Sequence, residues 1–152
     1  MTILNLNPAD KASLQPLSVN QRGQTRRLNI LVADDHPTNR KVMEIMLSKQ
    51  AEVVLVENGQ EAVAAALAET FDIILMDMQM PVMDGIRATR QIRIDEVETQ
   101  RPHVPILMLT AHSMDDHIEM GREAGADGHL NKPVSMAQLQ AVIETMTGTR
   151  GD

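Results

Sequence analysis

The sequence predicts an α/β fold in which a doubly wound parallel sheet is covered by helices on both faces. Three short apolar stretches, LNILVA (28–33), EVVLVE (52–57) and FDIILM (71–76), lack the alternation of a half-exposed strand. Such continuous apolar runs indicate strands that are buried on both faces. Helical stretches separate these runs, and helical crossovers between successive strands are typical of a parallel sheet.

Five predicted strands alternate with five predicted helices. The strands are expected at residues 28–33, 52–57, 71–76, 104–111 and 127–132. The helices are expected at residues 37–50, 58–69, 84–96, 115–125 and 135–146. No internal repeat or low-complexity segment interrupts this order, so we expect one domain of this kind.

The first two helices are indicated by different signals. In the first helix, Val42, Ile45 and Met46 recur at helical spacing after Pro37, a residue that suits a first helical turn. The second helix follows Asn58, which can cap it, and is rich in alanine, a strong helix former.

The three later helices are indicated by their apolar spacing and their ends. The third has Ile86 and Ile92 with arginines interleaved. The fourth is closed by Gly125, because glycine readily ends a helix, and the last begins after Ser135, a suitable N-cap.

Composition excludes several classes of protein. The chain has 152 residues, 43% of them apolar, which suits one folded domain. It has no cysteine, so disulfides, thiolate metal sites and cysteine nucleophiles are excluded. A net charge of -7 argues against a nucleic-acid partner. No apolar run approaches the roughly 20 residues that span a membrane, and no signal peptide is evident, so we expect a cytoplasmic domain without membrane contact.

The charge and composition of the two ends differ from those of the middle. Residues 1–27 carry four basic side chains against Asp10 alone and show no sustained period, so we expect a flexible linker or tail there. The packed domain is expected at 28–147 and a short C-terminal tail at 148–152. Because Phe71 is the only aromatic residue, the core must be filled by aliphatic side chains and many of the 12 methionines.

Polar residues stand at one end of the predicted strands. Asp34 and Asp35 come directly after the first strand, Asp77 after the third, Thr110 near the end of the fourth and Lys132 at the end of the fifth. In doubly wound sheets, ligands bind at the carboxyl ends of the strands, near the point where the strand order reverses. We therefore expect three carboxylates, a hydroxyl and an amine to meet at one edge.

This set of groups indicates phosphoryl chemistry. Three crowded carboxylates would repel one another and partly protonate unless a cation neutralised them, and oxygen ligands of this kind favour Mg²⁺. Lys132 and Thr110 would suit the remaining oxygens of a phosphoryl group. We expect a carboxylate oxygen of Asp77 to attack phosphorus, while Asp34 and Asp35 hold the metal ion.

Each of these residues has a plainer interpretation when it is taken alone. An aspartate after a strand, such as Asp35, is commonly a turn residue or a helix cap. Thr110 alone is an ordinary strand-end residue, and Lys132 alone is an ordinary surface charge. A functional site is favoured because all of them fall at the same end of their strands.

Four motifs resemble the receiver domains of two-component response regulators. These are LVADDHPTNR, LMDMQMPVMDG, LTAH and NKP, which occur in this order within residues 28–147. The resemblance implies a flavodoxin-like sheet of strand order 2-1-3-4-5. It also implies that Asp77 is the phosphoacceptor, and that Mg²⁺ is bound by Asp34, Asp35, Asp77 and the backbone carbonyl of Gln79.

The same resemblance implies a role for the last two strands. Thr110 corresponds to the switch hydroxyl and Lys132 to the lysine that contacts the phosphoryl group, with a cis bond between Lys132 and Pro133. The family usually has an aromatic residue three positions before the lysine, and here His129 stands in that place. Because imidazole side chains titrate near neutral pH, we hypothesise a weaker or pH-dependent switch, while an exposed strand residue is the plainer alternative.

Two further positions of the family tune the lifetime of the phosphoryl group. They are Gln79, two residues after the acceptor, and His112, two residues after the threonine. Neither is a carboxylate that could orient an attacking water, so we expect an intermediate lifetime.

Partners follow from the resemblance as well. A histidine kinase or a histidine phosphotransfer protein would donate the phosphoryl group, and a downstream partner would bind the surface formed by about residues 115–147. The stretch HPTNRKV at the first helix resembles receivers of hybrid histidine kinases. A receiver from such a kinase is favoured over a free-standing regulator. In either setting the domain would catalyse its own phosphorylation and dephosphorylation without turning over other substrates.

Two other classes of function are weighed against this one. Phosphatases of the haloacid-dehalogenase type also use an aspartate nucleophile, but they place a second aspartate two residues later, where this chain has Gln79. A pseudo-receiver would bind partners without phosphorylation. The presence of Asp77, Thr110 and Lys132 together argues against it.

Overall fold

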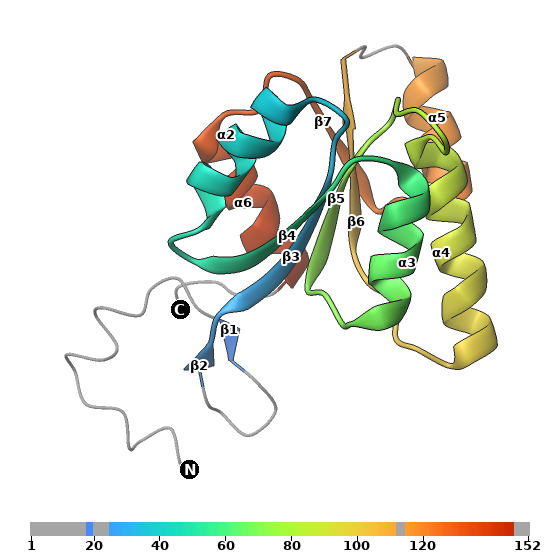
Figure 1. Ribbon diagram of the computed structural model, residues 1–152, viewed down its shortest axis with the longest axis horizontal. Helices are drawn as coiled ribbons and strands as arrows, with labels where there is room; N and C mark the ends of the chain where they lie inside the picture. Colours follow the sequence, from blue (N-terminus) through green and yellow to red (C-terminus); the bar gives the residue numbers. More distant parts are fainter. Residues whose placement is uncertain (1–17, 20–24, 112–114, 148–152) are drawn as a thin grey trace.

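The computed structural model describes residues 18–19, 25–111 and 115–147 and contains a five-stranded parallel sheet (Figure 1). The sheet strands are β3 (Leu28–Ala33), β4 (Ala51–Val56), β5 (Ile73–Asp77), β6 (Ile106–Thr110) and β7 (Gly128–Asn131). Their spatial order is β4-β3-β5-β6-β7. Counted along the chain from β3, this is the predicted order 2-1-3-4-5, which confirms the flavodoxin-like fold.

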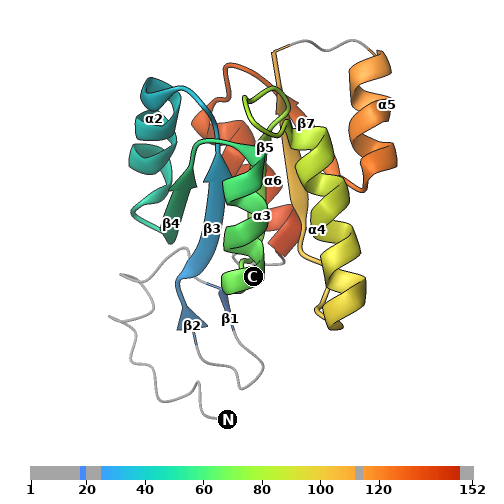
Figure 2. The same ribbon diagram turned by 45° about the vertical axis from the view of Figure 1, so that its right-hand side comes forward.

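Helices cover both faces of the sheet. They are α2 (Pro37–Leu47), α3 (Gly59–Ala68), α4 (Gly85–Thr99), α5 (Asp115–Ala124) and α6 (Met136–Thr147). α2 and α6 lie on one face, and α3, α4 and α5 lie on the other (Figures 1 and 2). From β3 the chain crosses to β4 at one edge of the sheet, whereas from β5 it crosses in the opposite direction, to β6 and then to β7 at the other edge. The strand order therefore reverses between β3 and β5.

Alternate residues of each central strand enter two separate cores. On β5, Ile74 and Met76 pack with α3 and α4, whereas Ile73 and Leu75 pack with α2 and α6. All four side chains are fully buried. This burial on both faces explains why the central strands read as continuous apolar runs.

The predicted helix ends are largely confirmed by their caps. The side chain of Asn58 accepts a hydrogen bond from Glu61 N (2.9 Å) at the start of α3. Ser135 Oγ accepts one from Gln138 N (3.1 Å) at the start of α6. Gly125 follows α5 with a φ of 113°, a left-handed conformation that favours glycine.

Some predicted boundaries were wrong by two or three residues. The first helix ends at Leu47 rather than at residue 50, because the chain turns there and Gln50 N donates to Leu47 O (3.0 Å). The third strand begins at Ile73 rather than at residue 71. In α2 the buried residues are Met43 and Leu47, so the helical spacing of Val42 and Ile45 marks an exposed face instead.

Most of the segments expected as tails, 1–27 and 148–152, lie outside the described residues. Within the first of them, β1 (Ser18–Val19) and β2 (Thr25–Arg26) pair as a short antiparallel ladder. Arg27 is attached to the domain, since its guanidinium donates to the carbonyl of Ala51 (2.8 Å) and lies 3.1 Å from a carboxylate oxygen of Glu52. In the described part of the chain, each helix is too short or too polar to cross a membrane.

Candidate functional site

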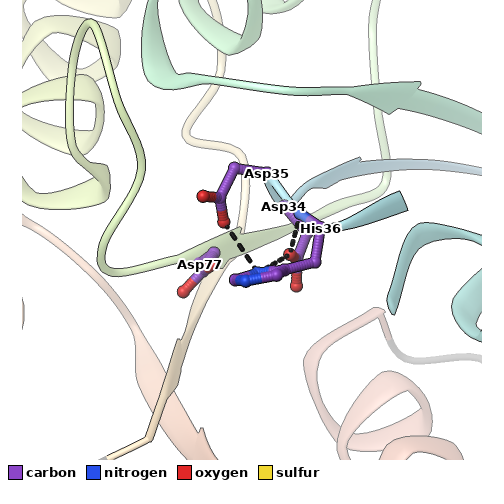
Figure 3. Close-up of side chains that lie close together, drawn as sticks. All are labelled: Asp34, Asp35, His36 and Asp77. Atoms are coloured by element: carbon purple, nitrogen blue, oxygen red, sulfur yellow. Dashed lines mark hydrogen bonds and ion pairs between the residues drawn. The ribbon is translucent and has the colours of Figure 1, made fainter. Parts of the chain in front are cut away.

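Two carboxylates stand at the ends of adjacent strands. Asp34 directly follows β3 and Asp77 is the last residue of β5, and these two strands pair in parallel. Both residues are buried, with 1% and 5% of their surface exposed. Asp35 and His36 follow Asp34, and the ligand atoms of all four residues lie within 4.8 Å of one another (Figure 3). The structure therefore brings together the three carboxylates expected from the strand ends.

Lys132 reaches this acidic cluster from the last strand of the sheet. Its Nζ atom lies 3.1 Å from Oδ2 of Asp34 and 3.1 Å from Oδ2 of Asp77. The bond between Lys132 and Pro133 is cis, as the sequence resemblance implied. One ammonium group thus bridges two buried carboxylates that come from strands β3 and β5.

Thr110 lies between Asp77, at the end of β5, and Lys132, just after β7. It ends β6, the strand between β5 and β7, and only 2% of its surface is exposed. Its carbonyl accepts a hydrogen bond from Lys132 N (2.8 Å). This bond fixes where the chain leaves β7, and so fixes the direction from which Lys132 enters the cluster.

The turn after β3 holds Asp34 through contacts that the sequence did not predict. The backbone N–H of His36 donates to Oδ1 of Asp34 (2.9 Å), and Nη1 of Arg40 donates to the carbonyl of Asp34 (2.8 Å). The His36 ring also lies against Asp35, with Nδ1 3.0 Å from Oδ1. The only sequence signal was the presence of polar residues after the acidic pair, and that signal does not say which atoms they reach.

Burial and charge act in opposite directions on Asp77 and Lys132. Burial raises the pKa of Asp77, the nearby Lys132 opposes this rise, and the negative charge of Asp34 adds to it, so the pKa is raised overall. Burial alone would lower the pKa of Lys132, but Asp77 and Asp34 outweigh it and the pKa is raised overall. Lys132 is therefore a firmly held cation, whereas the charge on Asp77 is incompletely compensated.

The donor set fits a hard divalent cation. One carboxylate oxygen from each of Asp34, Asp35 and Asp77 lies within 4.8 Å of the others, and carboxylate oxygens are the ligands that Mg²⁺ prefers. Oδ1 of Asp35 is buried and accepts no hydrogen bond among the described residues, although Nδ1 of His36 lies 3.0 Å away, so this oxygen keeps capacity to bind a cation. The negative charge left over after pairing with one lysine is also of the sign that a cation would neutralise.

The loop after Asp77 is folded back against the end of β5. The N–H of Gly85 donates to the carbonyl of Met78 (2.9 Å), and a Cβ atom at Gly85 would collide with the carbonyl oxygen of Asp77. Gln79 N donates to Oδ1 of Asp77 (3.3 Å). The role of the Gln79 carbonyl as a metal ligand stays a prediction.

His129 is an exposed residue of β7, opposite Met108 of β6. It lines a cavity of about 70 Å³ whose other walls include Met78, Met108, Ile118 and Gly121. An apolar space therefore lies beside the imidazole, between α5 and the sheet. His112, expected to tune the phosphoryl lifetime, lies outside the described residues.

A second cavity, of about 300 Å³, lies away from the acidic cluster. It is lined by the last residues of α3 and α6 and by the segments that precede β5 and β6, including Phe71, Val104 and Pro105. The Arg101 guanidinium on its wall already donates to two carbonyls of α3. None of the predicted site residues lines this cavity.

Comparison with known proteins identifies the family. The response regulator receiver domain model matches residues 30–144. The sensor protein GacS of Pseudomonas syringae pv. syringae is 42% identical over 125 residues, which cover 82% of this chain and 14% of that protein. The chain thus spans about one seventh of the length of this relative.

Solved structures agree with this match. The receiver domain of the sensor histidine kinase PA1611 from Pseudomonas aeruginosa, with a magnesium ion coordinated in its active-site cleft, has a TM-score of 0.73 and 38% identity, over 81% of this chain and 99% of that one. The receiver domain of Saccharomyces cerevisiae Ssk1, crystallised with the histidine phosphotransfer protein Ypd1, gives a TM-score of 0.77 and 29% identity, over 83% of this chain and 94% of that one. With its fold, its acidic cluster and its bridging lysine, this chain belongs to the family of response regulator receiver domains.

Proposed function

We propose that Asp77 accepts a phosphoryl group from a phosphohistidine donor and that the domain is the receiver of a phosphorelay. The observation that supports this most directly is the position of the Asp77 carboxylate. It is buried at the end of the sheet, 3.1 Å from Lys132 Nζ and beside two further aspartates. A Mg²⁺ ion bound by Asp34, Asp35, Asp77 and the Gln79 carbonyl would supply positive charge for the phosphoryl oxygens.

The residues of the chain have distinct roles in the proposed transfer. A carboxylate oxygen of Asp77 forms a bond to phosphorus while the bond from phosphorus to the donor nitrogen breaks. The electron pair of that bond stays on the donor ring, which leaves as neutral imidazole if its other nitrogen was protonated. Lys132 contributes its charge to the phosphoryl oxygens, and the Thr110 hydroxyl donates a hydrogen bond to them.

The surface beside the acceptor supports a protein donor. α2 begins three residues after Asp34, and it exposes two large apolar side chains, Val42 (47% exposed) and Ile45 (62%). An apolar patch at the rim of a polar site is typical of a docking surface. We propose that a histidine kinase or a histidine phosphotransfer protein binds here; the Ssk1 receiver was crystallised with a protein of the second kind, Ypd1.

The surface formed by α5, β7 and α6 is proposed to carry the output. His129 lies on this surface beside the 70 Å³ apolar cavity, so movement of the imidazole into that space would change the exposed face of β7. We therefore propose that Thr110 and His129 act together as the switch.

A titration tests this part of the proposal. The ratio of amide exchange rates in α5 and β7 with and without phosphorylation is expected to differ between about pH 6 and pH 8 in the wild type, because imidazole side chains are the ones whose charge is sensitive to pH near neutrality. The same response is expected to be independent of pH in His129→Tyr. Identical responses in both proteins across this range would exclude the role of His129.

Intact mass measurement tests the central proposal. Incubation with acetyl phosphate and Mg²⁺ is expected to add the mass of one phosphoryl group, and both Asp77→Asn and EDTA are expected to prevent this. Asp116→Asn serves as the matched control, because Asp116 is an exposed aspartate on α5. If the wild type gains no mass from acetyl phosphate or from a phosphorylated histidine donor, the domain is a pseudo-receiver and the proposal is wrong.

A further inference from the structure

The outer side of α4 carries a stripe of residues that the phosphorelay does not use. Arg87, Arg90, Ile94 and Val97 follow one another at spacings of three, four and three, which places them on one side of a helix. All four are exposed, and Val97 is 78% exposed. The buried residues of α4, such as Ile92 and Glu96, lie on the opposite side. α4 stands beside α3 on the outside of the sheet (Figure 2). Because all four side chains are exposed, no other described part of the chain covers this stripe.

The charges of α4 are arranged against the helix dipole. Its first half carries Arg87, Arg90 and Arg93, and its second half carries Asp95, Glu96 and Glu98. Cations are unfavourable near the start of a helix and anions near its end, because the dipole is positive at the start and negative at the end. This order therefore does not stabilise the isolated helix.

Only part of this charge order is explained by contacts inside the domain. Arg93 is largely buried, and it binds both carboxylate oxygens of Glu96 and one of Asp127. For Arg87, Arg90 and Glu98 the structure records no ion pair with any other described residue. Three exposed charges in an unfavourable order therefore remain without a reason in the single chain.

We infer that this side of α4 binds the same side of α4 in a second copy, with the two helices antiparallel. A two-fold axis midway between residues 90 and 94 would place Arg87 opposite Val97 of the second copy and Arg90 opposite its Ile94. Glu98, the exposed carboxylate in the second half of α4, would then lie near the basic first half of the other helix, and the two dipoles would also be antiparallel. Arg87 and Glu98, each unfavourably placed in its own helix, would become complementary across the pair.

The inferred pair of helices would make both a charge contact and apolar contacts. Glu98 lies one residue beyond Val97, a rise of about 1.5 Å along the axis, so it is within reach of Arg87 from the second copy. The aliphatic stems of Arg87 and Arg90 would cover Val97 and Ile94. A contact made through one helix of 15 residues is at the small end of the size range of protein interfaces, so we expect weak, concentration-dependent association.

Charge exchange within one chain tests the inference. The 16.8 kDa protein is followed by analytical ultracentrifugation from about 20 µM to about 1 mM, as wild type, Arg87→Glu, Glu98→Arg and the double variant. Each single variant is expected to weaken association by about ten-fold or more, because like charges then meet across the axis. The double variant is expected to return to within about three-fold of the wild type.

The rescue is specific to contacts between copies. Residues 87 and 98 are about 16 Å apart along one helix, so the two side chains cannot compensate for each other within a single chain. Arg87→Glu places a negative charge near the start of α4, and Glu98→Arg places a positive charge near its end. Both charges are favourable in the field of the helix dipole, so each single variant is expected to have a Tm at least as high as that of the wild type. Lys49→Glu, a charge reversal at an exposed lysine in the turn after α2, is the matched control and is expected to leave association unchanged.

Three results would overturn the inference. The wild type could stay monomeric up to about 1 mM, the single variants could associate as strongly as the wild type, or the double variant could fail to recover. The last result would show that α4 binds a second copy through some other pairing, or not at all. None of these measurements uses phosphorylation, so they do not depend on the function proposed for Asp77.

Discussion

At the scale of single residues, the acceptor carboxylate is destabilising where it stands. The pKa of Asp77 is raised, so its ionised form is less favourable in the folded chain than in the unfolded chain. The penalty is fully present above the raised pKa and disappears as the pH falls toward the ordinary value of 3.8. Buried ionisable groups that reduce the stability of the folded chain are typical of functional sites. A neutral side chain of the same shape would not carry this penalty.

Asp77→Asn is therefore expected to stabilise the domain in the presence of EDTA. Lys132 keeps its ion pair with Asp34, and the unfavourable charge is gone. Near pH 7 we expect the Tm to rise, with the difference shrinking at acidic pH as the wild-type carboxyl group becomes protonated. Adding Mg²⁺ should narrow the gap, because it stabilises the wild type more. A variant less stable than the wild type at neutral pH in EDTA would contradict this account.

Which residues meet at this edge of the sheet could be predicted from the sequence, but their contacts could not. Asp34 and Asp77 each stand at the end of a buried apolar strand, and Lys132 follows the last strand, which is short and partly exposed. The position of Arg40 on the carbonyl of Asp34, and of the His36 ring against Asp35, depends on the path of the turn after β3. That path has no periodic signature in the sequence.

At the scale of elements, the start of α4 is pressed against the acceptor strand. Gly85 is its first residue, and a Cβ atom there would collide with the Asp77 carbonyl oxygen and lie 3.0 Å from Met76 Cγ. Because the obstacle is backbone in the middle of the sheet, it cannot move aside easily. Glycine at this position is therefore required by close approach and not by an unusual φ.

Gly85→Ala is expected to destabilise the domain by about 1 to 3 kcal/mol, the usual effect of overpacking. It is also expected to slow phosphorylation by acetyl phosphate, because the displaced carbonyl belongs to the acceptor residue. Gly121→Ala is the matched control. A Cβ atom there would meet its nearest neighbours at 3.6 Å or more, so we expect no loss, or a gain from helix propensity. Equal urea midpoints for the wild type and Gly85→Ala would show that the contact is not restrictive.

Strands were easier to predict than the faces of helices. A strand buried on both sides is apolar throughout, so its existence follows from composition alone. For α2, the regular spacing of Val42 and Ile45 indicated a helix correctly but did not identify the buried side, because Met43 and Leu47 have an equally regular spacing. Which apolar stripe faces the sheet is decided by the tertiary fold.

At the scale of the whole molecule, one buried ionic network joins segments that are distant in sequence. Arg93 of α4 binds Glu96, Asp127 and the carbonyl of Gly125, and Glu96 also accepts from Val104 N (2.8 Å). The network therefore ties α4 to the start of β6 and to the connection between α5 and β7. Contacts across more than 30 positions leave no local pattern, so they could not be predicted from one sequence.

Glu96→Gln is expected to destabilise the domain by about 2 to 4 kcal/mol in urea unfolding, because it leaves Arg93 partly unpaired in a buried position. The pair between Glu119 and Arg122 provides the comparison, since it has the same spacing of three but is exposed on α5. Glu119→Gln is expected to have no measurable effect, because water already solvates both groups. Similar losses in the two variants would show that burial of the Arg93 pair is unimportant.

Both ends of the packed domain lie at the end of the sheet that is remote from the acidic cluster. β3 begins there at Leu28, and the last residue of α6, Thr147, lines the same cavity as Asp72 and Pro105, which lie just before β5 and β6. A strand of five or six residues, roughly 17 to 20 Å, separates these two ends from the acceptor. A fluorescent reporter or another module fused at either end, as in an engineered biosensor, is therefore expected to leave the edge of the sheet that carries Asp77 accessible.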